Sequence, residues 1–164
     1  MAVVSQAELI LQRAEWKRNG KRVVCTVGAF ELLHPGHIRR LEQARDLGDV
    51  LIVGVQSDAG VRATKPSGPG KLARPVHSAD ERAEIVAALE SVDSVAEFDA
   101  ASPRDFITGL SPDVLVLGGM AIGDESAYLD DPSFRAAVRS VVRIPLEPGY
   151  STSLLLDSIT QRHA

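Results

Sequence analysis

The sequence predicts a single α/β domain, spanning residues 1–164, whose five parallel strands form a doubly wound sheet. Short runs of branched apolar residues alternate along the chain with longer segments of helical periodicity, as in consecutive β–α units. The run at 49–55, DVLIVGV, is almost continuously apolar, which is typical of a strand that helices cover on both faces. A chain of 164 residues is also long enough to bury a hydrophobic core of its own.

The five predicted strands are apolar runs that end at glycine or at turn-forming residues. They are expected at residues 21–26, 49–55, 91–98, 113–117 and 141–144. Gly28, Ser57, Gly118 and Gly149 follow the first, second, fourth and fifth of them. The carboxyl ends of parallel strands lie at one edge of a sheet, and doubly wound sheets bind their ligands there. These loops therefore predict one binding site in a Rossmann-like fold.

The segments between the strands carry helix signals. Helices are expected at residues 6–18, 38–47 and 78–90, and from residues 102, 131 and 151 onwards, while 59–64 is a short segment without an assigned type. Leu9, Ile10 and Ala14 form the apolar side predicted for the first helix. Ser78 begins a Ser-Ala-Asp-Glu capping box, and Gly48 is the expected C-cap of the second helix.

Composition limits the class of protein. The net charge is −4, from 22 acidic and 18 basic residues, whereas proteins that bind DNA or RNA usually have a basic surplus. The single Cys25 permits no internal disulfide, and its place in an apolar strand favours core packing over a nucleophile. No apolar run approaches the roughly 20 residues that cross a bilayer, and no signal peptide is evident. We therefore expect a cytoplasmic protein that binds neither nucleic acid nor membrane.

The segment after the first strand carries the strongest functional signal. Residues 28–37 read GAFELLHPGH, with His34 and His37 where a helix begins. Such a strand–loop–helix junction offers free backbone N–H groups and the positive end of a helix dipole, which together favour a polyphosphate. Gly28 allows close approach of the backbone to a ligand, and Gly36 removes a side chain between the two imidazoles. The histidines are predicted to bind phosphate oxygens and carry a proton as negative charge develops; alternatively, one caps the helix and the other is a surface residue.

Further candidates for nucleotide phosphates are cations, hydroxyls and loop amides near the predicted edge. They are Ala29, Phe30, Gly118, Lys65, Arg74, Arg82, Ser151, Thr152 and Ser153, together with Gly28 and Gly36. Lys65 precedes a loop rich in glycine and proline that would close over a ligand, although a solvated loop lysine is the alternative. Arg82 lies in the first turn of a helix, where a cation is unfavourable, so it needs a partner such as Glu81 or Asp80. The hydroxyls at 151–153 suit a phosphate, but plain N-caps would need no ligand.

Four stretches resemble the nucleotidyltransferase superfamily marked by His-x-Gly-His. They are GAFELLHPGH at 28–37, VGVQSD at 53–58, RPV at 74–76 with DER at 80–82, and GYSTS at 149–153. Over residues 20–159 the chain looks most like the adenylyltransferase domain of the ADP-heptose synthases. That resemblance implies transfer of AMP from ATP to D-glycero-β-D-manno-heptose 1-phosphate, with release of pyrophosphate. It also implies a catalytic role for Lys65, Mg²⁺ bound with the triphosphate, and a homodimer; no cluster of carboxylates, Cys or His suggests a dedicated metal site.

Two alternatives remain open. Glycerol-3-phosphate cytidylyltransferase resembles the chain in fold and histidines and implies CTP with a polyol phosphate. It typically has an arginine shortly before the Ser-Thr motif, where this chain reads LEP at 146–148. The superfamily usually has Asn and Asp where this chain has Val27 and Glu31, and the heptose enzymes tend to carry Lys-Gly-Gly-Asp-Tyr where it reads LGGMA at 117–121. These departures leave the acceptor open and admit a non-catalytic nucleotide-binding module.

Overall fold

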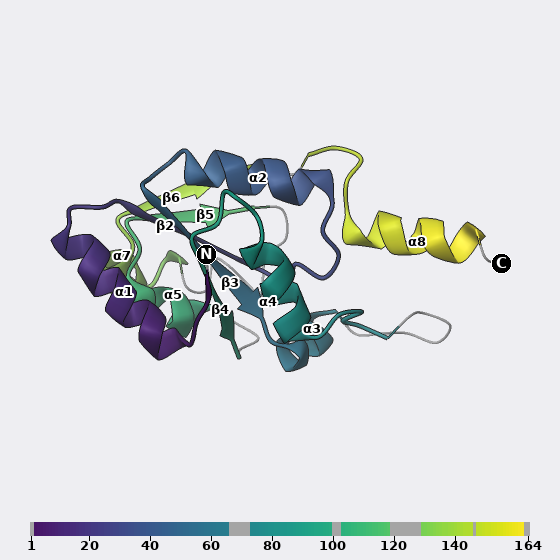
Figure 1. The fold of residues 1–164 in the computed structure, drawn as a ribbon, viewed down its shortest axis with the longest axis horizontal. Coiled ribbons are helices and arrows are strands. Elements are labelled where there is room, and N and C mark those ends of the chain that lie inside the picture. Colours follow the sequence, from purple (N-terminus) through teal and green to yellow (C-terminus); the bar gives the residue numbers. More distant parts are fainter. Residues whose placement is uncertain (1, 66–72, 100–102, 119–128, 146, 163–164) are drawn as a thin grey trace.

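A computed structural model describes residues 2–65, 73–99, 103–118, 129–145 and 147–162 of the chain (Figure 1). The strands within these residues are β1 (Ala2–Val3), β2 (Val23–Gly28), β3 (Val50–Gln56), β4 (Ser94–Phe98), β5 (Val114–Leu117) and β6 (Ser140–Arg143). The helices are α1 (Gln6–Arg18), α2 (Pro35–Arg45), α3 (Asp58–Thr64), α4 (Ala79–Ala87), α5 (Arg104–Leu110), α7 (Pro132–Ala137) and α8 (Thr152–Arg162). None of these helices combines the length and apolar character needed to cross a membrane.

The strands form one sheet in the order β1-β4-β3-β2-β5-β6, and every neighbouring pair is parallel. The five predicted strands are β2 to β6, so the parallel α/β prediction is confirmed. The prediction of five strands is corrected by β1, which pairs with the free edge of β4 through Ala2 opposite Ser94. A strand of two residues is too short to show a periodic pattern, which is why the sequence did not reveal it.

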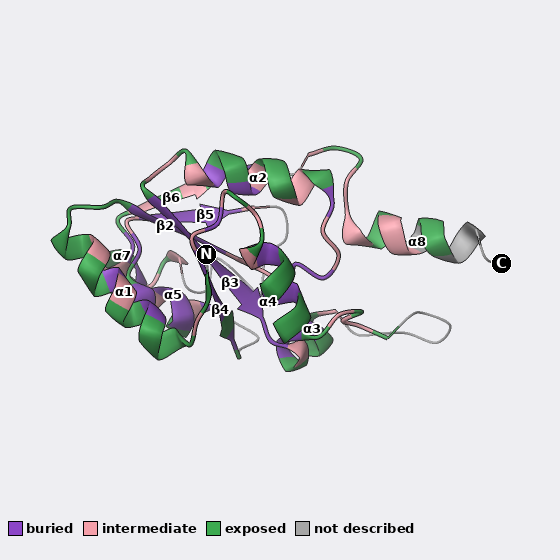
Figure 2. Cartoon of the chain, in the orientation of Figure 1, coloured by how far each residue is buried: buried purple, intermediate pink, exposed green. Residues whose placement is uncertain are grey.

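Helices cover both faces of the sheet, because successive strand residues point to opposite sides. On one face Cys25 and Leu115 pack with Leu9 of α1, Phe106 of α5 and Phe134 of α7. On the other face Val24, Leu51 and Val116 pack with Leu41 of α2 and Val86 of α4. Figure 2 shows the buried strands between helices whose outer sides are exposed. The sheet is therefore doubly wound, as predicted.

Strand β2 lies at the point where the strand order reverses, with β3 on one side and β5 on the other. Within β2, Thr26 is opposite both Val53 of β3 and Val116 of β5. In doubly wound sheets a crevice forms at this position, beyond the carboxyl ends of the strands. The loop that leads to His34 and His37 at the start of α2 therefore begins at the switch point of the sheet.

Two local predictions were wrong. Helix α1 buries Leu9 and Arg13, whereas Ile10 is 48% exposed; Arg13 donates to the Ser111 carbonyl and pairs with Asp113 at 3.1 Å. Helix α2 ends at Arg45 with a C-cap at Asp46, so Gly48 is not its cap. A Cβ at Gly48 would lie 2.7 Å from the carbonyl oxygen of Arg22. Close packing, and not helix termination, therefore requires glycine there.

Candidate functional site

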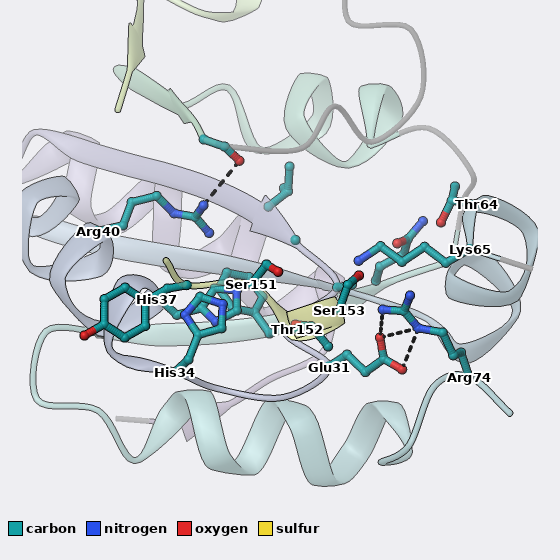
Figure 3. Close-up of a pocket in the computed structure, with 17 residues that line it drawn as sticks. Glu31, His34, His37, Arg40, Thr64, Lys65, Arg74, Ser151, Thr152 and Ser153 are labelled. Carbon is teal, nitrogen blue, oxygen red and sulfur yellow. Dashed lines mark hydrogen bonds and ion pairs between the residues drawn. The ribbon is translucent and has the colours of Figure 1, made fainter. Parts of the chain in front are cut away.

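A cavity of about 280 Å³ lies beyond the carboxyl ends of β2, β3 and β5 (Figure 3). Its walls come from the β2–α2 loop, the start of α2, the ends of β3 and β5, the end of α3, the segment with Arg74, and the segment that enters α8. The lining residues are Val27, Gly28, Ala29, Phe30, Glu31, His34, His37, Arg40, Gln56, Thr64, Lys65, Arg74, Gly118, Tyr150, Ser151, Thr152 and Ser153. The predicted site residues thus lie together at one edge of the sheet, except that Gly36 and Arg82 do not line the cavity.

His34 and His37 lie side by side where α2 begins. Their ring centroids are 3.9 Å apart and the ring planes are inclined by 24°. His34 occupies the N-cap position but its side chain makes no capping hydrogen bond, and it is only 8% exposed. A Cβ at Gly36 would lie 3.2 Å from His34 Nδ1 and 3.1 Å from Tyr150 Cβ, so glycine allows this close packing. The alternative of a capping histidine and a surface histidine is therefore wrong.

Burial keeps both imidazoles neutral in the free protein. It lowers the pKa of His37 to about 3; the charges of Arg40 and Lys65, and that of His34 whenever its ring is protonated, lower this pKa further. The pKa of His34 is also lowered, by burial and then by Arg40. The Nδ1 atoms of both rings are buried and have no hydrogen-bond partner in the described part of the chain. An anion in the cavity would favour protonation of the pair.

The loop between β2 and the histidines turns at Phe30, which has a φ of +46° and is 3% exposed. The Phe30 ring packs back over Gly28, where a Cβ would lie 2.7 Å from Phe30 Cε2. Gly28 is therefore needed for packing of this ring, and not only for the ligand approach that the sequence suggested. The turn brings Ala29 and Glu31 to the wall of the cavity.

Arg82 binds the backbone of this loop and does not line the cavity. It is fully buried, and its guanidinium donates to the carbonyl oxygens of Ala29 and His77 and pairs with Asp58 at 2.7 Å. The partner expected at Glu81 or Asp80 is wrong, because Glu81 instead closes the predicted capping box with Ser78. All three guanidinium nitrogens of Arg82 thus bind protein oxygens, and they link the loop to Asp58 and His77. This position outside the cavity does not fit the predicted contact with phosphate.

Glu31 and Arg74 form an ion pair in the cavity wall that the sequence did not reveal. The Arg74 Nε is 2.8 Å and 3.0 Å from the two carboxylate oxygens, and its Nη2 also contacts the carboxylate. The Glu31 side chain is fully buried. Lys65 lines the cavity near this pair, and its pKa is lowered by burial and by the charge of Arg74, against the opposing effect of Glu31. Because Glu31 neutralises Arg74, Lys65 contributes the net positive charge at this end.

The entrance to α8 forms another wall. Ser151 Oγ accepts a hydrogen bond from the Leu154 amide at 3.1 Å, so Ser151 is the N-cap of α8, as the alternative to a phosphate-binding role predicted. Thr152 and Ser153 also line the cavity, at the helix end with the positive dipole. Figure 1 shows α8 extending away from the sheet, so the start of α8 is the part of this helix at the cavity.

Sequence reasoning missed several lining residues, among them Glu31, Arg40 and Tyr150. Arg40 follows His37 by three positions and therefore lies on the same side of α2, a spacing that could have identified it. Tyr150 stacks beside His34 with ring centroids 6.0 Å apart. The predicted closing loop after Lys65 and the departure at 119–121 lie outside the described residues.

The cavity contains no preformed metal cage in the described residues, where no three His, Cys, Asp or Glu side chains group closely enough to hold an ion. Among the described residues that line the cavity Glu31 is the one carboxylate, and Arg74 already pairs with it. Mg²⁺ retains water and commonly binds through substrate phosphates. These residues fit an ion that enters with a triphosphate, and not one held by the protein alone.

Comparisons with known proteins agree with this geometry. The cytidylyltransferase-like family model matches residues 25–155. The chain is 43% identical over 153 residues to the bifunctional protein HldE of Rhodopseudomonas palustris strain HaA2, and 41% identical over 156 residues to HldE of Methylococcus capsulatus. These alignments cover 93% and 95% of this chain but 30% and 32% of the relatives, so the chain spans about a third of their length.

A solved structure has the same fold. The lipopolysaccharide core biosynthesis protein from Thermoplasma volcanium superimposes with a TM-score of 0.61 at 25% sequence identity. The superposition covers 78% of this chain and 98% of that protein. The family match extends from the middle of β2 into α8 and so includes every segment that lines the cavity. The chain therefore belongs to the cytidylyltransferase-like family of nucleotidyltransferases.

Proposed function

We propose that this chain transfers AMP from ATP to a sugar 1-phosphate, giving an ADP-sugar and pyrophosphate. D-glycero-β-D-manno-heptose 1-phosphate is the proposed acceptor, on the resemblance of the four motifs to the ADP-heptose synthases. The observation that carries the proposal is the stacked pair of neutral histidines at the start of α2, facing a cavity that also contains Lys65.

The proposed reaction forms one bond and breaks one. An oxygen of the acceptor phosphate attacks the α-phosphorus of ATP, and the bond from that phosphorus to the bridging oxygen of the β-phosphate breaks. The protein supplies positioning and charge compensation, and not a covalent nucleophile. His34 and His37 donate to the phosphoryl oxygens as negative charge builds up, and Lys65 compensates charge at the other end of the cavity. Mg²⁺, bound through the phosphates, would neutralise part of their charge.

A CTP-dependent reaction is the second candidate, because the matching family model is described as cytidylyltransferase-like. In that case the acceptor would be glycerol 3-phosphate or a related polyol phosphate. The two candidates share the histidines, the α8 entrance and the leaving pyrophosphate. They differ in the base and in the acceptor, so a substrate matrix distinguishes them.

The test is pyrophosphate release with Mg²⁺, crossing ATP and CTP with heptose 1-phosphate and glycerol 3-phosphate. We expect turnover with ATP and heptose 1-phosphate alone. Turnover with CTP and glycerol 3-phosphate would overturn the first candidate in favour of the second. Nucleotide binding without turnover in any pair would support the non-catalytic module. The molar mass, measured by size-exclusion chromatography with light scattering, tests the homodimer that the resemblance implies.

A further inference from the structure

Arg40 lines the cavity and is a cation that the proposed reaction does not use. It lies on α2 three residues after His37, and helical side chains lean towards the N-terminus of their helix. Its guanidinium reaches the end of β5, where Nη1 donates to the Gly118 carbonyl at 3.3 Å (Figure 3). A Cβ at Gly118 would lie 2.6 Å from Arg40 Cδ, so the glycine makes room for this side chain.

The charge of Arg40 lacks the carboxylate partner that the other buried and half-buried arginines have. Arg13, Arg74 and Arg82 pair with Asp113, Glu31 and Asp58. In the described parts of the chain Arg40 has no carboxylate partner, and its Nε is buried without a hydrogen bond. Burial accordingly lowers the pKa of Arg40. A desolvated guanidinium with unused donors facing a cavity is arranged to bind an anion.

We infer that Arg40 is a ligand for the triphosphate of the nucleotide, an inference that rests on the proposed function. Arg40 follows the two histidines on α2, lines the same cavity, and reaches Gly118 at the end of β5. The triphosphate must lie at the start of α2 for His34 and His37 to reach the transferred phosphoryl group. In Figure 3 the side chains of Arg40 and Lys65 lie on opposite sides of the cavity. A planar guanidinium can donate two parallel hydrogen bonds, which suits two phosphate oxygens.

The experiment measures the affinity of the full chain for ATP, CTP, adenosine and cytidine by calorimetry. Arg40→Gln removes the charge, and Arg40→Lys keeps it without the fork. Arg18→Gln is the matched control, because Arg18 is an exposed helical arginine on α1, outside the cavity. For the triphosphate that the wild type binds, we expect Arg40→Gln to weaken binding by at least about tenfold and Arg40→Lys to weaken it less. Binding of the matching nucleoside should change less than about twofold.

The outcomes separate this inference from the proposed function. Unchanged triphosphate affinity in Arg40→Gln would overturn the role of Arg40 even if the wild type turns over. An equal loss of affinity for the triphosphate and the nucleoside would also overturn it. Triphosphate binding that depends on Arg40, in a chain without turnover, would support this inference while contradicting catalysis. A wild type that binds neither triphosphate would overturn both.

Discussion

The imidazole rings of His34 and His37 stack with their centroids 3.9 Å apart. Two neutral rings can pack in this way, whereas two imidazolium ions at that distance would repel each other. The pair sits at the start of α2 with both Nδ1 atoms buried and without a hydrogen bond among the described residues. Charging either ring in the free protein is therefore unfavourable, and a bound polyanion would reverse that preference.

Removal of either ring should abolish turnover but not the fold. We expect His34→Ala and His37→Ala to retain nucleotide binding and to lose pyrophosphate release by about 100-fold or more, because each removes a donor to the reacting phosphate. Steady-state assays and thermal melts measure both properties. His77→Ala is the control, since His77 is partly exposed and outside the cavity. Near-normal turnover in both cavity variants would contradict the role of the pair.

The depressed pKa of His37 predicts how stability depends on pH. Between about pH 6.5 and its folded pKa of about 3, the unfolded state binds a proton at His37 that the folded state does not. The free energy of unfolding should therefore fall as the pH drops below 6.5, by roughly 1 kcal/mol per pH unit from this group, and should show no such contribution above 6.5. Urea unfolding of wild type and His37→Gln from pH 4.5 to 8 isolates the contribution. Parallel pH profiles would refute it.

The buried carboxylate of Glu31 should stabilise the cavity wall through Arg74. We expect Glu31→Gln to lower the free energy of unfolding by about 1–3 kcal/mol, because the buried fork of Arg74 loses its counter-charge. Adding Arg74→Gln should cost less than the sum of the single variants, with a coupling of at least about 0.5 kcal/mol. Denaturant titrations give all four values. Glu42→Gln, an exposed change on α2, should stay within about 0.5 kcal/mol; strict additivity of the first pair would contradict the linkage.

Lys65 should contribute to the rate, because Glu31 neutralises Arg74 and leaves Lys65 as the net positive charge near β3. We expect Lys65→Ala to reduce pyrophosphate release by about 100-fold and Lys65→Arg by less. Lys21→Ala, an exposed lysine outside the cavity, is the control. Unchanged release in Lys65→Ala would remove Lys65 from the mechanism.

Local sequence patterns predicted where the strands and helices lie, but predicted less well which side of a helix is buried. The apolar run at 49–55 became β3, and the capping box at Ser78 begins α4, as expected. On α1, by contrast, Ile10 was expected on the apolar side but is 48% exposed. Arg13 is buried instead, because Asp113 and the Ser111 carbonyl, about a hundred residues away, bind its guanidinium. The periodicity of a helix carries no information about a hydrogen-bond partner so distant in the sequence.

By itself the sequence determined the order of strands and helices and the strand–loop–helix junction with His34 and His37. These depend on backbone hydrogen bonding, caps and apolar periodicity over a few neighbouring residues. Only the tertiary structure decided that Arg82 binds the backbone of the loop, that Glu31 pairs with Arg74, and that Arg40 reaches Gly118. The burial and charge of a side chain depend on segments that the fold brings together at the sheet edge, and that distance in sequence hides them from local patterns.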